Sequence, residues 1–175
     1  DSMLLNILRR AKELIERGET LFASPYLHFF LANRFTNEDL QNPEILENFC
    51  NLDDSEIISA IKVWQNVEDT TLSILCQKLI QRNLLKIKIA ETPYSAEEIA
   101  ARKLEVCTQL GIPPEEADYF IVAGKLSNNT YNTDGDTLKI GMKDGSLKEL
   151  SEASEIYNLS ADNKPTIKYF ITSLN

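Results

Sequence analysis

The apolar positions in the first half of the chain recur at helical spacing. Residues 3–17 place an apolar side chain at every third or fourth position, and Gly18 then ends the segment. This pattern predicts an amphipathic helix whose charged residues, Arg10 among them, face away from the core. Further helices are expected where a capping side chain or a proline at the first helical position occurs. These signals lie at Ser24-Pro25, Asn42-Pro43, Asp53 with Glu56, and Asp69.

One of these helices, at residues 26–31, carries apolar side chains on nearly every side. A helix of that kind must be covered all round, either by the rest of the chain or by a partner. We take Tyr26, Phe29 and Phe30 as candidate interface residues, because exposed apolar patches of that size usually mark interfaces.

The hydrophobic pattern changes from helical to alternating at Leu84. Ile87 and Ile89 should face one way and Lys86 and Lys88 the other, as in a half-buried strand. A helix should follow from the capping box of Ser95 and Glu98 to Gly111. The next element is a strand over Tyr119–Leu126, which is apolar on both faces and is therefore expected at the centre of its sheet. A hairpin turn over Ser127–Asp136 should lead into a strand at 138–142, followed by a helix at 150–159 and a strand at 167–171.

Together these elements predict an α+β fold. Residues 1–82 should form an N-terminal helical bundle with short connections. Residues 83–175 should form a second module with the order β-α-β-β-α-β, a ferredoxin-like arrangement whose sheet is mainly antiparallel.

Composition narrows the classes of function. The chain has 175 residues, of which 43% are hydrophobic and 26% charged, so it can form one or two globular domains. A net charge of -9 argues against a nucleic-acid partner, since phosphate contacts need a basic surface. No apolar run approaches the ~20 residues of a membrane span, and no signal peptide opens the chain. Cys50, Cys76 and Cys107 have apolar neighbours and read as small buried side chains in a reducing cytoplasm.

Few residues have the pattern of a reactive site. His28 is the only histidine, and its apolar neighbours favour a packed or interface side chain over a catalytic base. Asp53, Asp54 and Glu56 could bind a hard cation, but their place before a helix favours capping. The segment 134–136 resembles a calcium loop only faintly and favours a turn. We therefore expect no catalytic residue and no metal site in this chain.

Arg82, Lys86 and Lys88 are the strongest binding candidates. Lys86 and Lys88 share one face of the expected strand, and Arg82 lies at the corner where helix gives way to strand. Such a cluster can hold phosphate through a forked arginine contact and lysine point charges. The alternative is the solvated face of an amphipathic strand.

Three segments together resemble a known family. They are residues 21–31, residues 52–57 with Trp64, and residues 81–86. They are similar to the C-terminal region of bacterial HD-superfamily phosphohydrolases, the group related to deoxynucleoside triphosphate triphosphohydrolases. The resemblance runs over most of the chain, and its most recognisable motif is Arg82-Asn83-Leu84-Leu85-Lys86.

The resemblance implies that the full-length protein cleaves a phosphate ester, with a deoxynucleoside triphosphate as the expected substrate, at a divalent metal that activates water. The family's metal site needs several histidines, so we expect it upstream of this chain, which has only His28. Residues 1–82 would then dock on that HD catalytic domain, and residues 83–175 would serve regulation or assembly. We expect no cofactor in this part, and a cytoplasmic homo-oligomer.

The resemblance also implies a role for two basic residues. In relatives with an allosteric nucleotide site, the arginine and lysine of this motif grip the phosphates of the effector, which points to Arg82 and Lys86 here. The alternative function is a free-standing cytoplasmic module for protein interaction or regulation, without enzymatic activity. A self-sufficient hydrolase that uses carboxylates alone is disfavoured, because no acidic pair lies in a predicted pocket.

Overall fold

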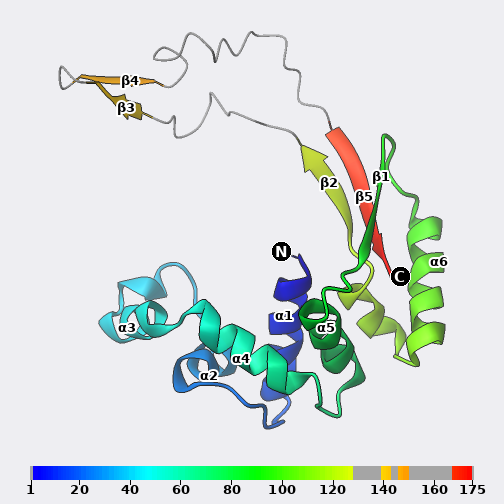
Figure 1. The fold of residues 1–175 in the computed structure, drawn as a ribbon, viewed down its shortest axis with the longest axis horizontal. Helices are drawn as coiled ribbons and strands as arrows, with labels where there is room; N and C mark the ends of the chain where they lie inside the picture. Colours follow the sequence, from blue (N-terminus) through cyan, green and yellow to red (C-terminus); the bar gives the residue numbers. More distant parts are fainter. Residues whose placement is uncertain (1, 128–138, 143–145, 150–166, 175) are drawn as a thin grey trace.

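The computed structural model describes residues 2–127, 139–142, 146–149 and 167–174. Helices form the first part of the chain and strands dominate the second, as Figure 1 shows, so the predicted α+β class is confirmed. The helices are α1 (Ser2–Glu16), α2 (Pro25–Ala32), α3 (Pro43–Asn51), α4 (Asp54–Trp64), α5 (Thr70–Ile80) and α6 (Ala96–Leu110), with short 3-10 turns η1 (Asp39–Gln41) and η2 (Pro114–Tyr119). The strands are β1 (Lys86–Ala90), β2 (Ala123–Ser127), β3 (Lys139–Gly141), β4 (Leu147–Glu149) and β5 (Ile167–Ser173).

The helices begin where the sequence predicts them. Ahead of α4, the carboxylate of Asp53 accepts hydrogen bonds from the backbone of residues 55 and 56, while Glu56 accepts one from the Asp53 backbone. Ser95 and Glu98 form the same reciprocal capping box ahead of α6. Each box satisfies backbone donors that a helix start would otherwise leave unpaired.

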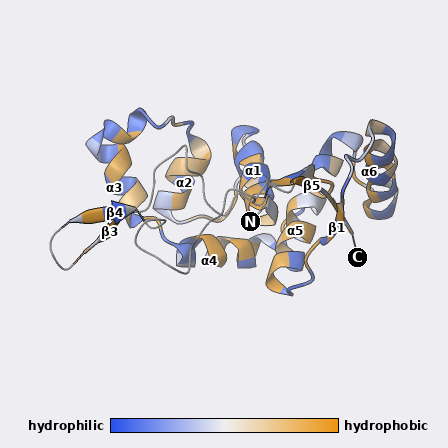
Figure 2. Cartoon of the chain, turned by 90° about the horizontal axis from the view of Figure 1, so that it is seen from above, coloured by the Kyte–Doolittle hydropathy of each residue, from blue (hydrophilic) through white to orange (hydrophobic). Residues whose placement is uncertain are grey.

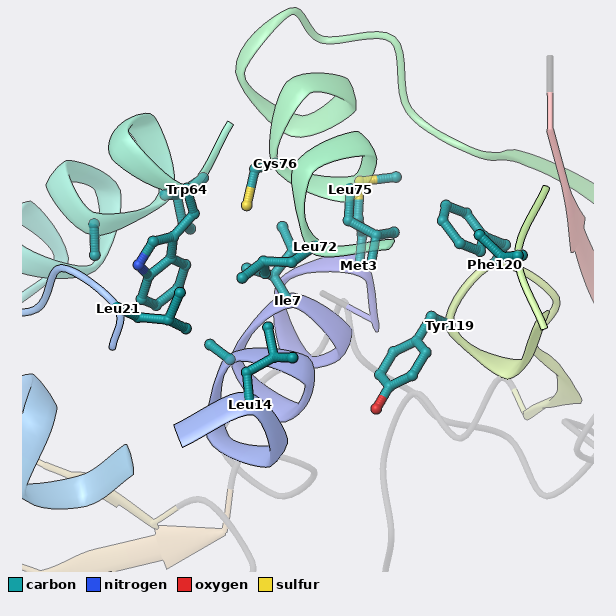
Figure 3. Close-up of a cluster of buried hydrophobic side chains, with 14 of the residues drawn as sticks. Met3, Ile7, Leu14, Leu21, Trp64, Leu72, Leu75, Cys76, Tyr119 and Phe120 are labelled. Carbon is teal, nitrogen blue, oxygen red and sulfur yellow. The ribbon is translucent and has the colours of Figure 1, made fainter. Parts of the chain in front are cut away.

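One hydrophobic core joins the helical part to the sheet. In Figure 3, Leu72 of α5 lies beside Ile7 of α1 on the side of Trp64, and Leu75 lies beside Met3 on the side of Phe120. Phe120, which is fully buried, adds a side chain from beyond residue 82 to the same cluster. The predicted division into 1–82 and 83–175 stays a prediction, but residues from both sides of it share this core.

The main sheet has three strands in the order β1-β5-β2, and both pairs are antiparallel. The prediction of a central strand over Tyr119–Leu126 was wrong, because β2 starts only at Ala123 and pairs with β5 alone among the described strands. The reason lies in Thr172, whose hydroxyl accepts from the backbone N–H of Val122 and donates to the carbonyl of Phe120. The hydroxyl thus takes the N–H of Val122, which a continued ladder would pair with the backbone, although the N–H of Thr172 still donates to the carbonyl of Val122.

The predicted ferredoxin-like order differs from the described strands in one respect. Its third strand corresponds to β3, which pairs with β4 in a separate two-stranded sheet and not with β1, β5 or β2. The predicted hairpin turn, the segment 134–136 and the helix at 150–159 lie outside the described residues.

The strand β1 was expected to be half-buried, and that prediction was wrong. Ile87 is 62% exposed and Ile89 is 54% exposed. Figure 2 shows the pair β1 and β5 between α6 on one side and α1 with α5 on the other. Helix α6 lies beside the face that carries Lys88, whose charge acts on Glu98 at the start of that helix. The opposite face, with Ile87 and Ile89, lies toward α1 and α5, yet both side chains stay more than half exposed.

Candidate functional site

Arg82 occupies a strained position at the end of α5. The backbone N–H of Arg82 donates to the carbonyl of Leu79 at 3.2 Å, and that of Asn83 donates to the carbonyl of Lys78 at 2.9 Å. This pair of bonds is a Schellman motif, in which glycine usually occupies the left-handed position. Arg82 holds that position with φ +57, as the non-glycine residue with positive φ in the described part of the chain. An ordinary side chain there costs about 1–2 kcal/mol.

Beside Arg82 lies a cavity of about 540 Å³ that we call the α1–β1 groove. Its walls come from α1, α4, α5, β1 and β5, and Arg82 is the charged residue among the described residues that line it. The apolar side chains include Met3, Leu4, Ile58, Leu79, Leu84 and Ile87.

The structure separates the predicted phosphate-binding residues. Neighbouring residues of a strand point to opposite faces, so Lys86 and Lys88 lie on the face opposite Ile87. Ile87 lines the groove with Arg82, and Lys86 is not among the groove residues. The two lysines thus share a face, as predicted, while Arg82 lies at the groove. All three side chains are exposed.

Two of the candidate interface residues, Phe29 and Phe30, belong to an aromatic cluster at the helical end of the molecule. Phe29 stacks on Phe35 with ring centres 5.1 Å apart, and Phe30 meets Phe49 edge to face at 6.2 Å. Phe29 and Phe30 are half-buried, and Tyr26 is 36% exposed. The chain therefore covers this helix only in part. Its fully covered residues are Leu27 and Leu31.

A buried ionic network was missed by the sequence reasoning. Arg10 was expected to face solvent, but its side chain is only 3% exposed and contacts Asp69 and Glu116. Burial acts to lower the pKa of Arg10, but the hydrogen bonds and charges of both carboxylates outweigh it, so the pKa is raised. Thr71 donates a further hydrogen bond to Glu116. One signal was present: Arg10 lies three residues after Ile7, on the same stripe of α1.

The other candidate groups differ in their surroundings. His28 is exposed on α2, so the chain does not bury it, and its role as an interface side chain stays a prediction. Cys76 is fully buried, and this burial raises the pKa of its thiol to about 12. Cys50 is exposed, against the expectation that all three cysteines are buried, and Cys107 is intermediate.

Neither a metal-binding cluster nor a membrane-spanning helix is found among the described residues. Within the described ranges, no group of three or more His, Cys, Asp or Glu side chains could hold a metal ion. In that same part of the chain, none of the helices has the length and apolar character that a membrane crossing requires.

Comparison with known proteins shows that the chain is similar to a solved structure and to a protein sequence. The chain is 40% identical to a phosphohydrolase from Bacteroides thetaiotaomicron VPI-5482, with a TM-score of 0.82, over 99% of this chain and 43% of that structure. It is 27% identical over 161 residues to the uncharacterized protein YwfO of Bacillus subtilis, covering 88% of this chain and 34% of YwfO. No family model matches the chain. The chain therefore spans less than half the length of either relative.

Proposed function

We propose that this chain is a non-catalytic part of a phosphohydrolase whose catalytic site lies elsewhere in a longer polypeptide. The observation that carries this proposal is the similarity, at 40% identity over 99% of the chain, to less than half of a solved phosphohydrolase. An identity of that size over a whole structural unit supports a shared role for the unit within the parent protein.

The structural roles of four carboxylates and one buried thiol support the non-catalytic part of the proposal. Asp69 and Glu116 are held by Arg10, and Asp53 and Glu98 cap helices. A catalytic base must be within reach of a substrate proton, and a nucleophile must be activated. A buried thiol such as Cys76, with a pKa near 12, stays protonated at neutral pH.

The finer proposal assigns the parent to the HD superfamily and its substrate to the deoxynucleoside triphosphates. A divalent metal held by upstream His and Asp side chains would activate the attacking water. The motif Arg82-Asn83-Leu84-Leu85-Lys86 supports this assignment by its resemblance to that family. We place the parent protein in the cytoplasm as a homo-oligomer.

The corner at Arg82 supports a regulatory role for the second half of the chain. We assign Arg82 and Lys86 to the phosphates of a nucleotide effector. A strained arginine where glycine would fit supports a function for its side chain, because strained residues persist where they serve one. The separation of Lys86 from the groove implies that the phosphates would lie across the edge strand β1 and not inside the groove.

The aromatic cluster supports a docking role for the helical half. Tyr26, Phe29 and Phe30 would contact the upstream catalytic domain, because aromatic side chains that are only part-covered are common at interfaces. The same exposure would also suit a free-standing interaction module, which is the competing function.

Activity of the full-length gene product tests the proposal. We expect metal-dependent release of phosphate, with deoxynucleoside triphosphates turned over faster than ribonucleotides or simple phosphate esters. Loss of activity after substitution of an upstream His-Asp pair would assign the site. A full-length product with no upstream His-Asp pair and no phosphohydrolase activity would favour the interaction module.

Nucleotide titration of the full-length protein tests the effector site. We expect Arg82→Ala with Lys86→Ala to weaken effector binding while leaving the fold intact. Lys125→Ala, on the opposite edge strand β2, is the matched control, because it removes an exposed lysine of the same sheet. Unchanged binding and activation in the double variant would leave both residues with a structural role only.

A further inference from the structure

The α1–β1 groove leaves large apolar side chains uncovered. Leu84 is 51% exposed, Ile87 is 62% exposed and Ile58 is 39% exposed, and all three line the groove. They come from two separate parts of the chain, α4 and the segment that leads into β1, yet they meet around one cavity of about 540 Å³. Contiguous exposed apolar surface of this kind marks a site of contact.

The chemistry of the groove favours an apolar occupant. Among the described residues that line it, the one ionisable side chain is Arg82, and Thr172 is buried with its hydroxyl already bonded to the backbone. A nucleotide inside the groove would leave most of its phosphate and sugar oxygens without donors, which is costly in an apolar site. Side chains of a polypeptide would instead bury the exposed surface of Leu84 and Ile87.

The start of α1 lies at this groove. Ser2, Met3 and Leu4 all line it, and Figure 1 shows the N-terminus at the end of α1 that is nearer the sheet. A polypeptide that continues upstream of this chain in a longer protein would therefore join it beside the groove. A segment tethered there has a high effective concentration at the site, so even modest apolar contacts would hold it.

We propose that the α1–β1 groove is the seat of the polypeptide that directly precedes Ser2 in the full-length protein. This inference rests on the proposed function, since it requires that the chain be part of a longer phosphohydrolase. The relatives allow for such a segment, because the chain spans only 43% of the solved phosphohydrolase and 34% of YwfO. At the groove, the upstream polypeptide would contact both the helical half and the sheet.

A second copy of this chain fits the same surface less well. The nearest route to a symmetric contact is pairing of the edge strand β1 with itself. A two-fold antiparallel pair centred on Ile87 would set Lys86 opposite Lys88, and one centred on Lys88 would set that residue opposite its copy. Like charges directly opposite each other destabilise a sheet, so a tethered segment of the same molecule is favoured.

Site-specific photocrosslinking in the full-length protein identifies the occupant. Ile87→p-benzoylphenylalanine puts the photoreactive group in the groove, and Leu104→p-benzoylphenylalanine is the control, because Leu104 is 68% exposed on α6 away from the groove. We expect the Ile87 variant to crosslink to a peptide that precedes Ser2. Mixing isotopically heavy and light protein should show that the link forms within one molecule, and the control should give no such link.

Three outcomes would overturn the inference: a link to a second copy, a link to residues after Asn175, or no link at Ile87. Hydroxyl-radical footprinting gives a second readout on the unmodified protein. We expect Leu84 to be oxidised several-fold more slowly than Leu104, although this structure exposes 51% of Leu84 and 68% of Leu104. Equal rates would also overturn it. Phosphate release, measured on the same preparation, reports on the proposed function separately, so an upstream crosslink in an inactive protein would refute only that function.

Discussion

The guanidinium of Arg10 on α1 binds the carboxylate of Asp69 at the start of α5 through two hydrogen bonds, Nε to Oδ1 at 3.1 Å and Nη2 to Oδ2 at 2.6 Å. The same carboxylate accepts the backbone N–H of Leu72 at 2.7 Å and so caps α5. Asp69 thus serves both as a helix cap and as the partner of a buried cation. This arrangement fixes the start of α5 against the middle of α1.

Replacing Arg10 should destabilise the fold strongly. Arg10→Met keeps most of the side-chain volume but leaves Asp69 and Glu116, each only 13% exposed, without their cation. Removing one partner of a buried ion pair typically costs about 3–5 kcal/mol of unfolding free energy. Urea denaturation measures this loss.

The control for that experiment is Arg17→Met on the same helix. Arg17 is 59% exposed and lies 3.9 Å from Glu13, so its loss should change stability by less than about 0.5 kcal/mol. If the Arg10 and Arg17 variants unfold at the same urea concentration, the network does not contribute as described.

Arg82→Gly should leave the fold as stable as before or make it more stable by about 1 kcal/mol, because glycine adopts the left-handed conformation without the clash of a Cβ. Effector binding, if Arg82 contributes to it, should weaken in the same variant. The control makes the opposite change, Gly111→Ala at φ +66, where nothing lies within 4 Å of the added Cβ and only the backbone conformation matters. That change should destabilise by about 1 kcal/mol. A clear loss of stability in Arg82→Gly would show that the side chain itself supports the fold.

The sequence predicted the helix starts well because their causes are local. The capping boxes of Asp53 with Glu56 and of Ser95 with Glu98 join residues three positions apart, so the pattern alone contains the interaction. The pairing of Arg10 could not be found this way, since its partners lie 59 and 106 residues away. A charged residue on an apolar stripe was the only local sign of it.

The exposure of β1 and the position of Arg82 show a second limit of what the sequence pattern can predict. Alternation assigns Ile87 and Lys86 to opposite faces, and the structure agrees, but it does not say which face a neighbouring helix covers. Helix α6 lies beside the lysine face, so the apolar face became part of a groove. The apolar run after Tyr119 likewise read as a strand, although Thr172 ties its first residues into a turn.

Acid should weaken the start of α6. Hydrogen bonding from the Ser95 backbone holds the pKa of Glu98 below its ordinary value of 4.5. A carboxyl whose pKa is lower in the folded state stabilises the fold above its unfolded pKa, and that contribution disappears as pH falls through the folded value. Urea midpoints should therefore fall as pH decreases below about 4.5, and Glu98→Gln should reduce the slope in that window. An unchanged slope would mean that Glu98 does not titrate with folding.

The cysteines should differ sharply in reactivity. Cys50 is exposed, whereas Cys76 is buried with a pKa raised to about 12, so at pH 8 its thiol is protonated and covered. A disulfide reagent such as dithionitrobenzoate should modify Cys50 rapidly and Cys76 only after unfolding. Cys50→Ser should remove the fast phase. Rapid modification of Cys76 in the folded protein would contradict the packing of α5 against α1 and α4.

The central claim is that catalysis belongs to polypeptide outside these 175 residues. Its most direct test is to assay this chain, purified alone, beside the full-length protein for phosphate release from deoxynucleoside triphosphates with Mn²⁺ or Mg²⁺, and to measure the metal bound to each. We predict turnover and stoichiometric metal in the full-length protein, and neither in the chain alone. Metal-dependent turnover by the isolated chain, with a metal held wholly by its own side chains, would contradict the account.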